Sequence, residues 1–142
     1  MNSRFAVAVH ILALVERGAG EPVPSEYIAS SVNTNASLIR RLLGQLTRAG
    51  ITTSRLGAGG GTMLARPAER VTLGDVYRAV DAGEIFGLHP EAPNPACPVG
   101  RNIQDLLCEE IDEARQALEQ SLDRTTIADI AAGIAARERV TR

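Results

Sequence analysis

The sequence predicts a mainly α-helical fold with one small β-hairpin, and three stretches carry that prediction. Residues 36–49 repeat apolar side chains at the spacing of one helix face. Residues 57–61 hold four glycines between two short runs that suit β-strands. Residues 101–122 repeat apolar side chains every three or four positions, as in a helix that pairs with another. The predicted fold class is a winged helix-turn-helix domain followed by a long C-terminal dimerisation helix.

The first expected helix begins at a cap formed by Asn2 or Ser3 and ends near Glu16. It is apolar on two sides, which indicates burial between two layers. His10 lies within it and is interpreted as a core or interface histidine, because the sequence offers no partner for a proton or metal sensor. Glycines and prolines then end the helix.

Two helices joined by a polar turn follow. Ser25 is expected to cap the first of them, in which Tyr27 and Ile28 would face the core. Asn35 is a good cap for the second, and Gly50 closes it. This spacing is typical of a helix-turn-helix.

The exposed face of the second helix is cationic and polar. Between residues 27 and 68 the chain has five arginines and no acidic residue. The major groove of DNA and its flanking phosphates require such a surface, where an arginine can bond to guanine or to phosphate. The residues predicted to contact DNA are Ser25, Asn35, Ser37, Arg40, Arg41, Gln45, Arg48, Arg55, Gly59 and Gly60.

The formal net charge of −2 conceals a segregation of charge along the chain. Residues 36–78 contain seven arginines and two acids, whereas residues 81–129 contain eleven acids and three arginines. Because the local field rather than the total charge attracts a polyanion, the acidic total does not exclude DNA binding.

The glycine-rich stretch has two interpretations. Residues 51–55 and 62–64 can pair as strands, so the glycines would form the tip of a wing that lies along the DNA backbone. A nucleotide-binding loop would need a helix directly after the glycines, usually opened by lysine and Ser or Thr, whereas TMLARP follows here. The sequence therefore favours the wing.

Downstream of Pro67, Thr72 is expected to cap a helix that ends at Val80. Residues 83–100 contain four prolines and three glycines without periodicity, which predicts a loop. The helix over 101–122 would be roughly 30 Å long, too long for the small domain to cover. We expect it to pair with the same helix of a second chain through Ile103, Leu107, Ile111, Ala114 and Leu118.

The predicted organisation has three parts. Residues 1–82 would form the DNA-binding domain, and residues 83–100 a loop in a sensor position. Residues 101–142 would contain the dimerisation helix and a final amphipathic helix. No segment suits a bilayer span or a signal peptide, so a cytoplasmic protein without membrane contact is expected. No nucleophile motif or acid pair points to catalysis, so no enzyme is expected.

The two cysteines, Cys97 and Cys108, are too few for a disulfide scaffold and fit a reducing compartment. They are interpreted either as inert thiols or as a redox or electrophile switch, in which oxidation of Cys97 moves the loop. A partial metal site with His89 is the weaker alternative, because the spacing is not diagnostic. No metal site is predicted.

The chain resembles, over nearly its whole length, the Rrf-two family of bacterial winged-helix transcription regulators, which includes regulators of the IscR, NsrR and CymR kinds. The matching segments are SEYIASSV, LIRRLLGQLTRAGI, GAGGGTMLARPAERVTLGDVYRAVD and CPVGRNIQDLL. The resemblance implies a homodimer, joined by the long helix, on double-stranded DNA with a palindromic operator. By this resemblance, Arg40 corresponds to the base-reading position. We expect Arg48 and Arg55 to contact phosphates, and we expect the protein to act as a repressor.

The chain departs from the family pattern at two places. Iron–sulfur members use three cysteines before the dimer helix, whereas here only Cys97 corresponds to one of them, so no cofactor is predicted. Members commonly have arginine before the first wing glycine, where this chain has Leu56. The alternative function is a sensor or scaffold that does not bind DNA and acts through protein contacts of its acidic long helix.

Overall fold

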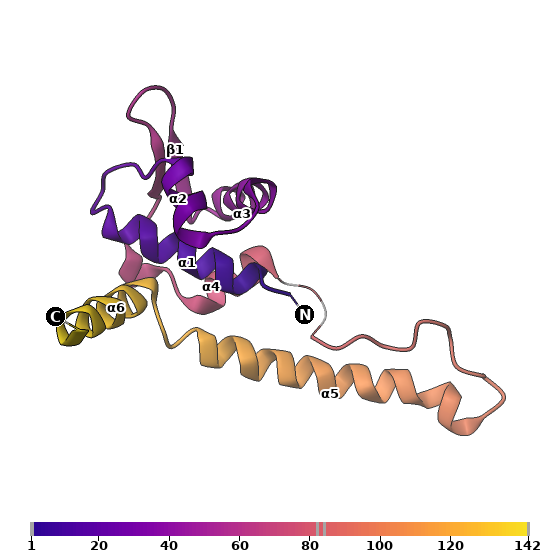
Figure 1. Ribbon diagram of the computed structural model, residues 1–142. Helices are drawn as coiled ribbons and strands as arrows, with labels where there is room; N and C mark the ends of the chain where they lie inside the picture. Colours follow the sequence, from indigo (N-terminus) through magenta and orange to yellow (C-terminus); the bar gives the residue numbers. More distant parts are fainter. Residues whose placement is uncertain (1, 82, 84, 142) are drawn as a thin grey trace.

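A computed structural model describes residues 2–81, 83 and 85–141 of the 142-residue chain. Five helices gather around one core, a β-hairpin stands at one end, and the longest helix projects as an arm (Figure 1). The mainly α fold with a small wing and a long C-terminal helix is confirmed. The elements in order are α1 (Arg4–Arg17), α2 (Ser25–Val32), α3 (Ala36–Arg48), β1 (Thr52–Arg55), β2 (Gly61–Leu64), the 3-10 turn η1 (Ala68–Arg70), α4 (Leu73–Val80), α5 (Pro98–Leu122) and α6 (Ile127–Thr141).

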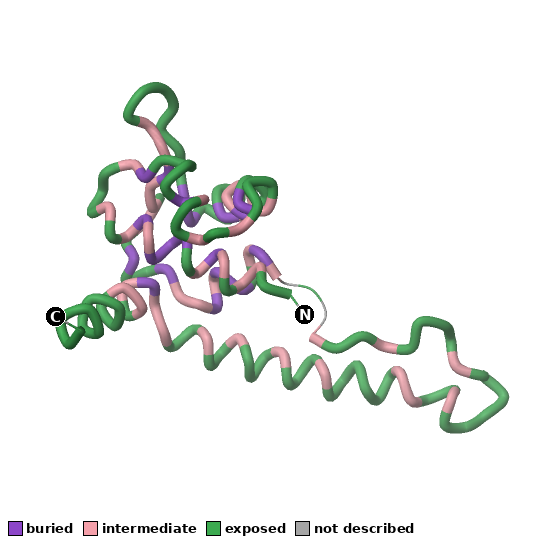
Figure 2. Tube along the Cα trace, in the orientation of Figure 1, coloured by how far each residue is buried: buried purple, intermediate pink, exposed green. Residues whose placement is uncertain are grey.

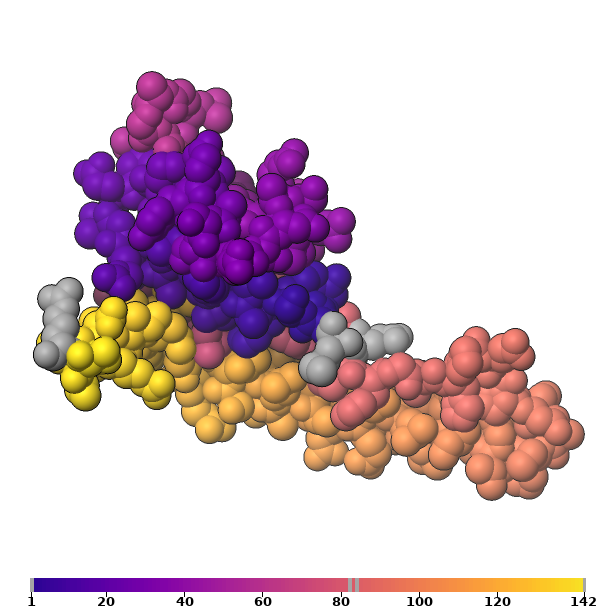
Figure 3. All heavy atoms as spheres, in the orientation of Figure 1, coloured from indigo at the N-terminus to yellow at the C-terminus, as the bar shows by residue number. Residues whose placement is uncertain are grey.

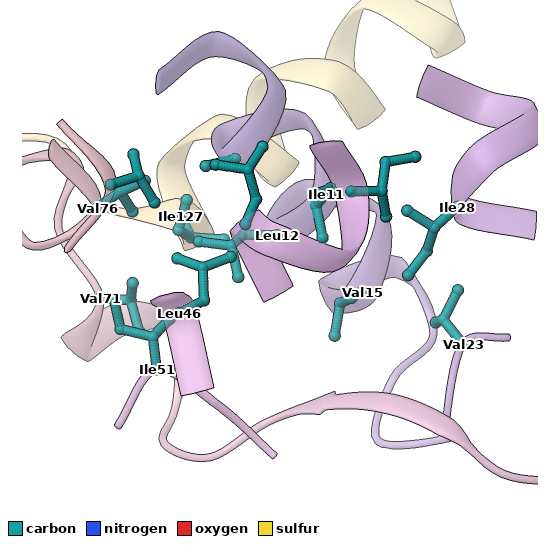
Figure 4. Packing of buried hydrophobic residues seen from close by; sticks show 14 of the residues in the cluster. Ile11, Leu12, Val15, Val23, Ile28, Leu46, Ile51, Val71, Val76 and Ile127 are labelled. Atoms are coloured by element: carbon teal, nitrogen blue, oxygen red, sulfur yellow. The ribbon is translucent and has the colours of Figure 1, made fainter. Parts of the chain in front are cut away.

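The core is aliphatic and centres on α1, which packs against α2, α3, α4 and α6. Its buried residue Leu12 lies toward Leu46 of α3 and Ile127 of α6, whereas Ile11 lies toward Ile28 of α2 (Figure 4). This explains why α1 is apolar on two sides. Because Ile127 is fully buried, α6 shares the core of the amino-terminal domain. The three-part division stays a prediction, and its boundary at residue 82 lies outside the described residues.

The first turn of α2 differs from the prediction. Pro24 is the N-cap, with φ −65° and ψ 148°, and its carbonyl accepts the N–H groups of Tyr27 and Ile28 at 3.1 Å. Ser25 is therefore the first helical residue and not the cap. Ile28 is buried as expected, but the inward orientation of Tyr27 is wrong, because its side chain is 59% exposed. A helix of eight residues buries one stripe, and Ile28 occupies it.

Helix α3 begins and ends as predicted. The Oδ1 atom of Asn35 accepts the N–H of Leu38 at 3.0 Å, which satisfies one of the N–H groups that a helix start leaves without a partner. Gly50 follows the C-cap with φ +76°, a conformation that glycine adopts without steric cost.

The wing consists of two paired strands and is attached to the rest of the domain at Val23 and at α3. Strands β1 and β2 pair antiparallel, with Thr52 opposite Leu64 and Arg55 opposite Gly61. Val23 forms a third rung, because its N–H and carbonyl exchange hydrogen bonds of 2.9 Å with Thr62. The Thr52 hydroxyl lies 2.9 Å from the hydroxyl of Thr47 in α3. The wing is therefore fixed to both helices of the helix-turn-helix.

Helix α5 begins at Pro98, so the expectation of a loop up to residue 100 is wrong at its end. Proline suits the first helical position, since its φ is already helical and no N–H is needed there. Cys97 is consequently the N-cap. None of the residues of α5, all of which the structure describes, is buried, and Figure 2 shows the arm without a buried position. On the predicted dimer face, Leu107 and Leu118 remain 37% and 38% exposed.

The interpretation of His10 as a core residue is wrong, because its side chain is exposed. Its Nε2 lies 2.9 Å from the Ser31 hydroxyl and links α1 to α2. None of the helices that the structure describes is at once long and apolar enough to cross a lipid bilayer.

Candidate nucleic-acid interface

A cleft opens between the start of α2, the exposed face of α3 and the wing. It brings together four of the predicted DNA-contacting residues, Ser25, Arg40, Arg55 and Gly60. The wing and α3 lie on the side of α1 away from α5 and α6, so the arm does not cover them in this view (Figure 3). A ligand that lies across α3 and the wing would meet all three cleft walls.

The amphipathic pattern of α3 sorts its residues onto two faces. Ile39, Leu42 and Leu46 are buried, whereas most of the side chains that the pattern placed outward are exposed. The exposed residues of the predicted set on this helix are Ser37, Arg40, Arg41 and Arg48. An α-helix that presents such a face matches the width of the major groove.

Three residues of the predicted set are constrained in other ways. Gln45 is half-buried, and its Oε1 has no hydrogen-bond partner among the described residues. Asn35 is exposed, but its Oδ1 is used in the helix cap, so only its amide NH₂ group is available to a ligand. Arg48 folds back along α3, because a Cβ atom on Gly44 would lie 3.3 Å from its Nη1.

The arginines of this surface differ in electrostatic environment from those behind it. Among the described residues, no carboxylate forms an ion pair with Arg40, Arg41, Arg48 or Arg55. Six ion pairs form in other parts of the described chain. Guanidinium groups without a carboxylate partner keep their five donors for a ligand. The surface is therefore cationic and not neutralised by its own fold.

Glu26 and Leu56 are two of the cleft residues outside the predicted set. Glu26 lines the cleft beside Arg40 and Arg55, so it is an anionic group at the edge of a cationic surface. It stands one position before the acid-free stretch, and only the fold brings it to the cleft. Leu56 is 91% exposed at the wing tip, next to Gly57 with φ +88°.

The two thiols lie far apart on α5. Both are exposed, and the eleven residues between Cys97 and Cys108 correspond to roughly 16 Å of helix rise. The backbone N–H groups of Gly100 and Val99, at the start of α5, lower the pKa of the Cys97 thiol from its usual value of 9.0. Cys97 is therefore the more activated position for a thiolate, at the start of the arm.

Comparisons with known proteins agree on one family. The Rrf2 family model, described as an iron-dependent transcriptional regulator, matches residues 1–133. YwnA of Bacillus subtilis (strain 168), named as a candidate HTH-type transcriptional regulator, is 44% identical over 131 residues, which are 92% of this chain and 96% of YwnA. Protein rrf2 of Nitratidesulfovibrio vulgaris is 32% identical over 129 residues, 91% of this chain and 83% of that protein.

Solved structures show the same fold. A crystal structure of a candidate DNA-binding protein is 39% identical with a TM-score of 0.72, and the match covers 90% of this chain and 98% of that one. The structure of CymR of B. subtilis, named the global cysteine regulator, is 24% identical with a TM-score of 0.66 and covers 93% of this chain and 95% of that one.

The iron in the family description does not fit the thiols of this chain. Two cysteines separated by roughly 16 Å along one helix cannot ligate the same small cluster. In the part of the chain that the structure describes, no three His, Cys, Asp or Glu side chains gather at metal-binding distance, so the partial site of His89, Cys97 and Cys108 does not form. His89 lies instead in an apolar hollow with Phe86 and Leu107.

Proposed function

The chain belongs to the Rrf2 family of transcriptional regulators, and from this premise we propose that it is a homodimeric repressor that binds a palindromic operator. The observation that carries the proposal is the exposed face of α3 and the wing, where four arginines have no carboxylate partner among the described residues. Such a surface releases counterions from DNA when it binds phosphate.

In the proposed complex, α3 enters the major groove with Ser37, Arg40 and Arg41 toward the base edges. Arg40 lines the cleft between α3 and the wing, so it can approach a base while the wing follows the backbone. Arg48 and Arg55 then lie at the two ends of the surface, where they contact phosphates and fix the register.

The dimer of the proposal forms through α5. This helix leaves its apolar residues half-exposed in a single chain, and pairing two copies would bury them. A two-fold axis along the paired arms presents two α3 helices, and two-fold protein symmetry requires an operator whose half-sites repeat as a palindrome.

A cysteine response completes the proposal. Cys97 is exposed and its pKa lies below the usual value, so its thiolate would attack hydrogen peroxide, break the O–O bond and become a sulfenic acid, with hydroxide as the leaving group. The change occurs at the N-cap of α5, where it would alter the start of the arm and the adjoining loop. Peroxide should weaken DNA binding of the wild type and leave a Cys97→Ala variant unaffected.

A DNA-binding titration tests the proposal as a whole. Fluorescence anisotropy would compare a duplex from the chain's own promoter region with a scrambled duplex, over a series of salt concentrations. We expect tighter binding to the promoter duplex and a steep loss of affinity with salt. The double variant Arg40→Ala/Arg41→Ala, with an unchanged melting temperature, should lose the preference. Absence of wild-type binding to either duplex would favour the sensor or scaffold function.

A further inference from the structure

A cluster of charged side chains joins α4 to the C-terminal end of α5, which we call the base of the arm. The guanidinium of Arg78 donates to Oε1 of Glu119 at 3.2 Å and to Oδ1 of Asp123 at 2.7 Å, both at the C-terminal end of α5. It also donates to Oδ1 of Asp75 at 3.2 Å. Asp75 pairs with Arg66 as well, at 3.2 Å. We call these five side chains the Arg78 cluster.

The backbone next to the cluster is fixed to the domain. The N–H of Leu73 donates to the Thr125 carbonyl at 2.9 Å, and the N–H of Ile127 donates to the Val71 carbonyl at 2.8 Å. The Thr72 hydroxyl donates to Oδ1 of Asp123 at 3.1 Å. The helices pack closely here, because a Cβ atom on Gly74 would overlap the Asp123 carboxylate. The turn after α5 therefore cannot rotate independently of α4.

Among the described residues, no ion pair joins the rest of α5 to the other helices, and the loop around Phe86 and His89 lies against it, at Leu107 and Ile111. The 25 residues of α5 span roughly 37 Å, and none of these described residues is buried. A rotation of about 10° at the base would move the far end by roughly 6 Å for a helix of this length. A small rotation at the Arg78 cluster therefore displaces the far end of α5 by a large distance.

We propose that the Arg78 cluster is a positioning device that fixes the angle between α5 and the DNA-binding domain and thereby sets the spacing of operator half-sites. The inference rests on the proposed dimeric DNA-binding function. Exposed ion pairs contribute little to overall stability, so stability alone does not account for three carboxylates on one guanidinium. A planar guanidinium with several directional bonds instead restricts the orientation of the groups that it joins.

The first experiment measures the angle without DNA. Nitroxide labels on Ala49→Cys in α3 and Glu109→Cys in α5, both exposed positions, report an intramolecular distance in a Cys97→Ser/Cys108→Ser background. Labelled protein is mixed with an excess of unlabelled protein, so that distances between chains do not contribute. Pulsed electron paramagnetic resonance should give one narrow distribution, and Arg78→Gln should broaden it.

A matched control removes an arginine of α5 whose ion pair stays within α5. Arg115 pairs with Asp112 three residues earlier at 3.6 Å, so Arg115→Gln should leave the distribution narrow. Glu119→Gln removes one bond of the cluster and should give intermediate broadening even if Arg78→Gln folds poorly. A distribution in Arg78→Gln as narrow as that of Arg115→Gln would overturn the proposal.

The second experiment measures the spacing of half-sites. Moving one half-site by a single base pair turns it by about 35° around the duplex. Wild-type affinity should fall on the order of tenfold, as for a poorly matched site, whereas Arg78→Gln should bind all spacings within about threefold of one another. A spacing preference as steep in Arg78→Gln as in the wild type would contradict the inference. If the wild type binds no DNA, the operator role fails with the proposed function, and the label distances still decide whether the cluster fixes the arm.

Discussion

Arg40 is the residue on which base reading depends in this account, because it alone among the α3 arginines lines the cleft with the wing. Arg40→Ala should cost about 1–3 kcal/mol of operator binding and relax the preference at one base pair. Arg48→Ala should weaken binding to all sequences alike and reduce the salt slope by about one. Titrations of both variants on operator and scrambled duplexes separate these roles. Equal losses on both duplexes from Arg40→Ala would contradict base reading.

Glu26 should oppose DNA binding from within the cleft. Glu26 lines the same cleft as Arg40 and Arg55, so its negative charge would repel a phosphate that enters there. Glu26→Gln should tighten binding by up to about 1 kcal/mol, and the gain should shrink as salt screens it. Glu138→Gln, an exposed change on α6, serves as the control of equal charge. An unchanged or weaker affinity in Glu26→Gln would show that DNA does not approach this side of the cleft.

Asp123 reports directly on the Arg78 cluster. Hydrogen bonds from Arg78 hold its pKa below the usual 3.8, and the Thr72 hydroxyl acts in the same direction. A carboxyl with a lowered folded-state pKa stabilises the fold above pH 3.8 and loses that contribution as pH falls through the folded value. The carboxyl carbon of Asp123, followed by NMR, should titrate below 3.8 in the wild type and closer to 3.8 in Arg78→Gln. Identical midpoints would mean that the pair does not form in solution.

Individual elements differ in how far the sequence predicts them. Helix α3 follows from local signals, namely its apolar stripe, the Asn35 cap and Gly50, and each of these holds in the structure. The start of α2 does not follow from local signals, because both Pro24 and Ser25 can precede the first helical turn. Only tertiary packing decides that Ile28 is buried and Tyr27 is exposed. Most of the expected residues of α3 and the wing are exposed, whereas Gln45 and Gly60 are half-buried, and the contacts of all of them with DNA stay predictions.

Features joined across long distances in the chain leave no local signal. Arg78 and Asp123 are 45 positions apart, and no local pattern in the sequence pairs them. Glu26 and Arg55 line the same cleft because Val23, three residues before Glu26, pairs with Thr62 of the wing. Sequence patterns describe the faces of single elements, whereas these contacts depend on how the elements pack.

The wing should be sensitive to any side chain at Gly60. A Cβ atom there would overlap the carbonyl oxygen of Arg55, so Gly60→Ala must distort the tip. We expect a severalfold loss of DNA affinity with little change in melting temperature, because the tip contributes no residue to the core. Ala58→Ser, an exposed change in the same tip, is the control. Wild-type affinity in Gly60→Ala would show that the wing is not part of the interface.

At the scale of the whole molecule, the charge segregation of the sequence corresponds to a division of space. The arginines without a carboxylate partner among the described residues lie on α3 and the wing, and the acidic residues concentrate on α5, on the other side of α1 (Figure 1). In the proposed dimer, an acidic arm would repel the duplex and keep it at the cationic face. The Arg78 cluster joins these two parts.

A hydroxyl-radical footprint of the chain on its own promoter region tests whether two copies of α3 and the wing dock on DNA. We expect two protected patches related by a two-fold axis, with centres about one helical turn or a multiple of it apart. Both patches should disappear in Arg40→Ala/Arg41→Ala. A single patch without symmetry, or a footprint that survives the loss of both arginines, would contradict the claim that α3 and the wing dock on DNA twice.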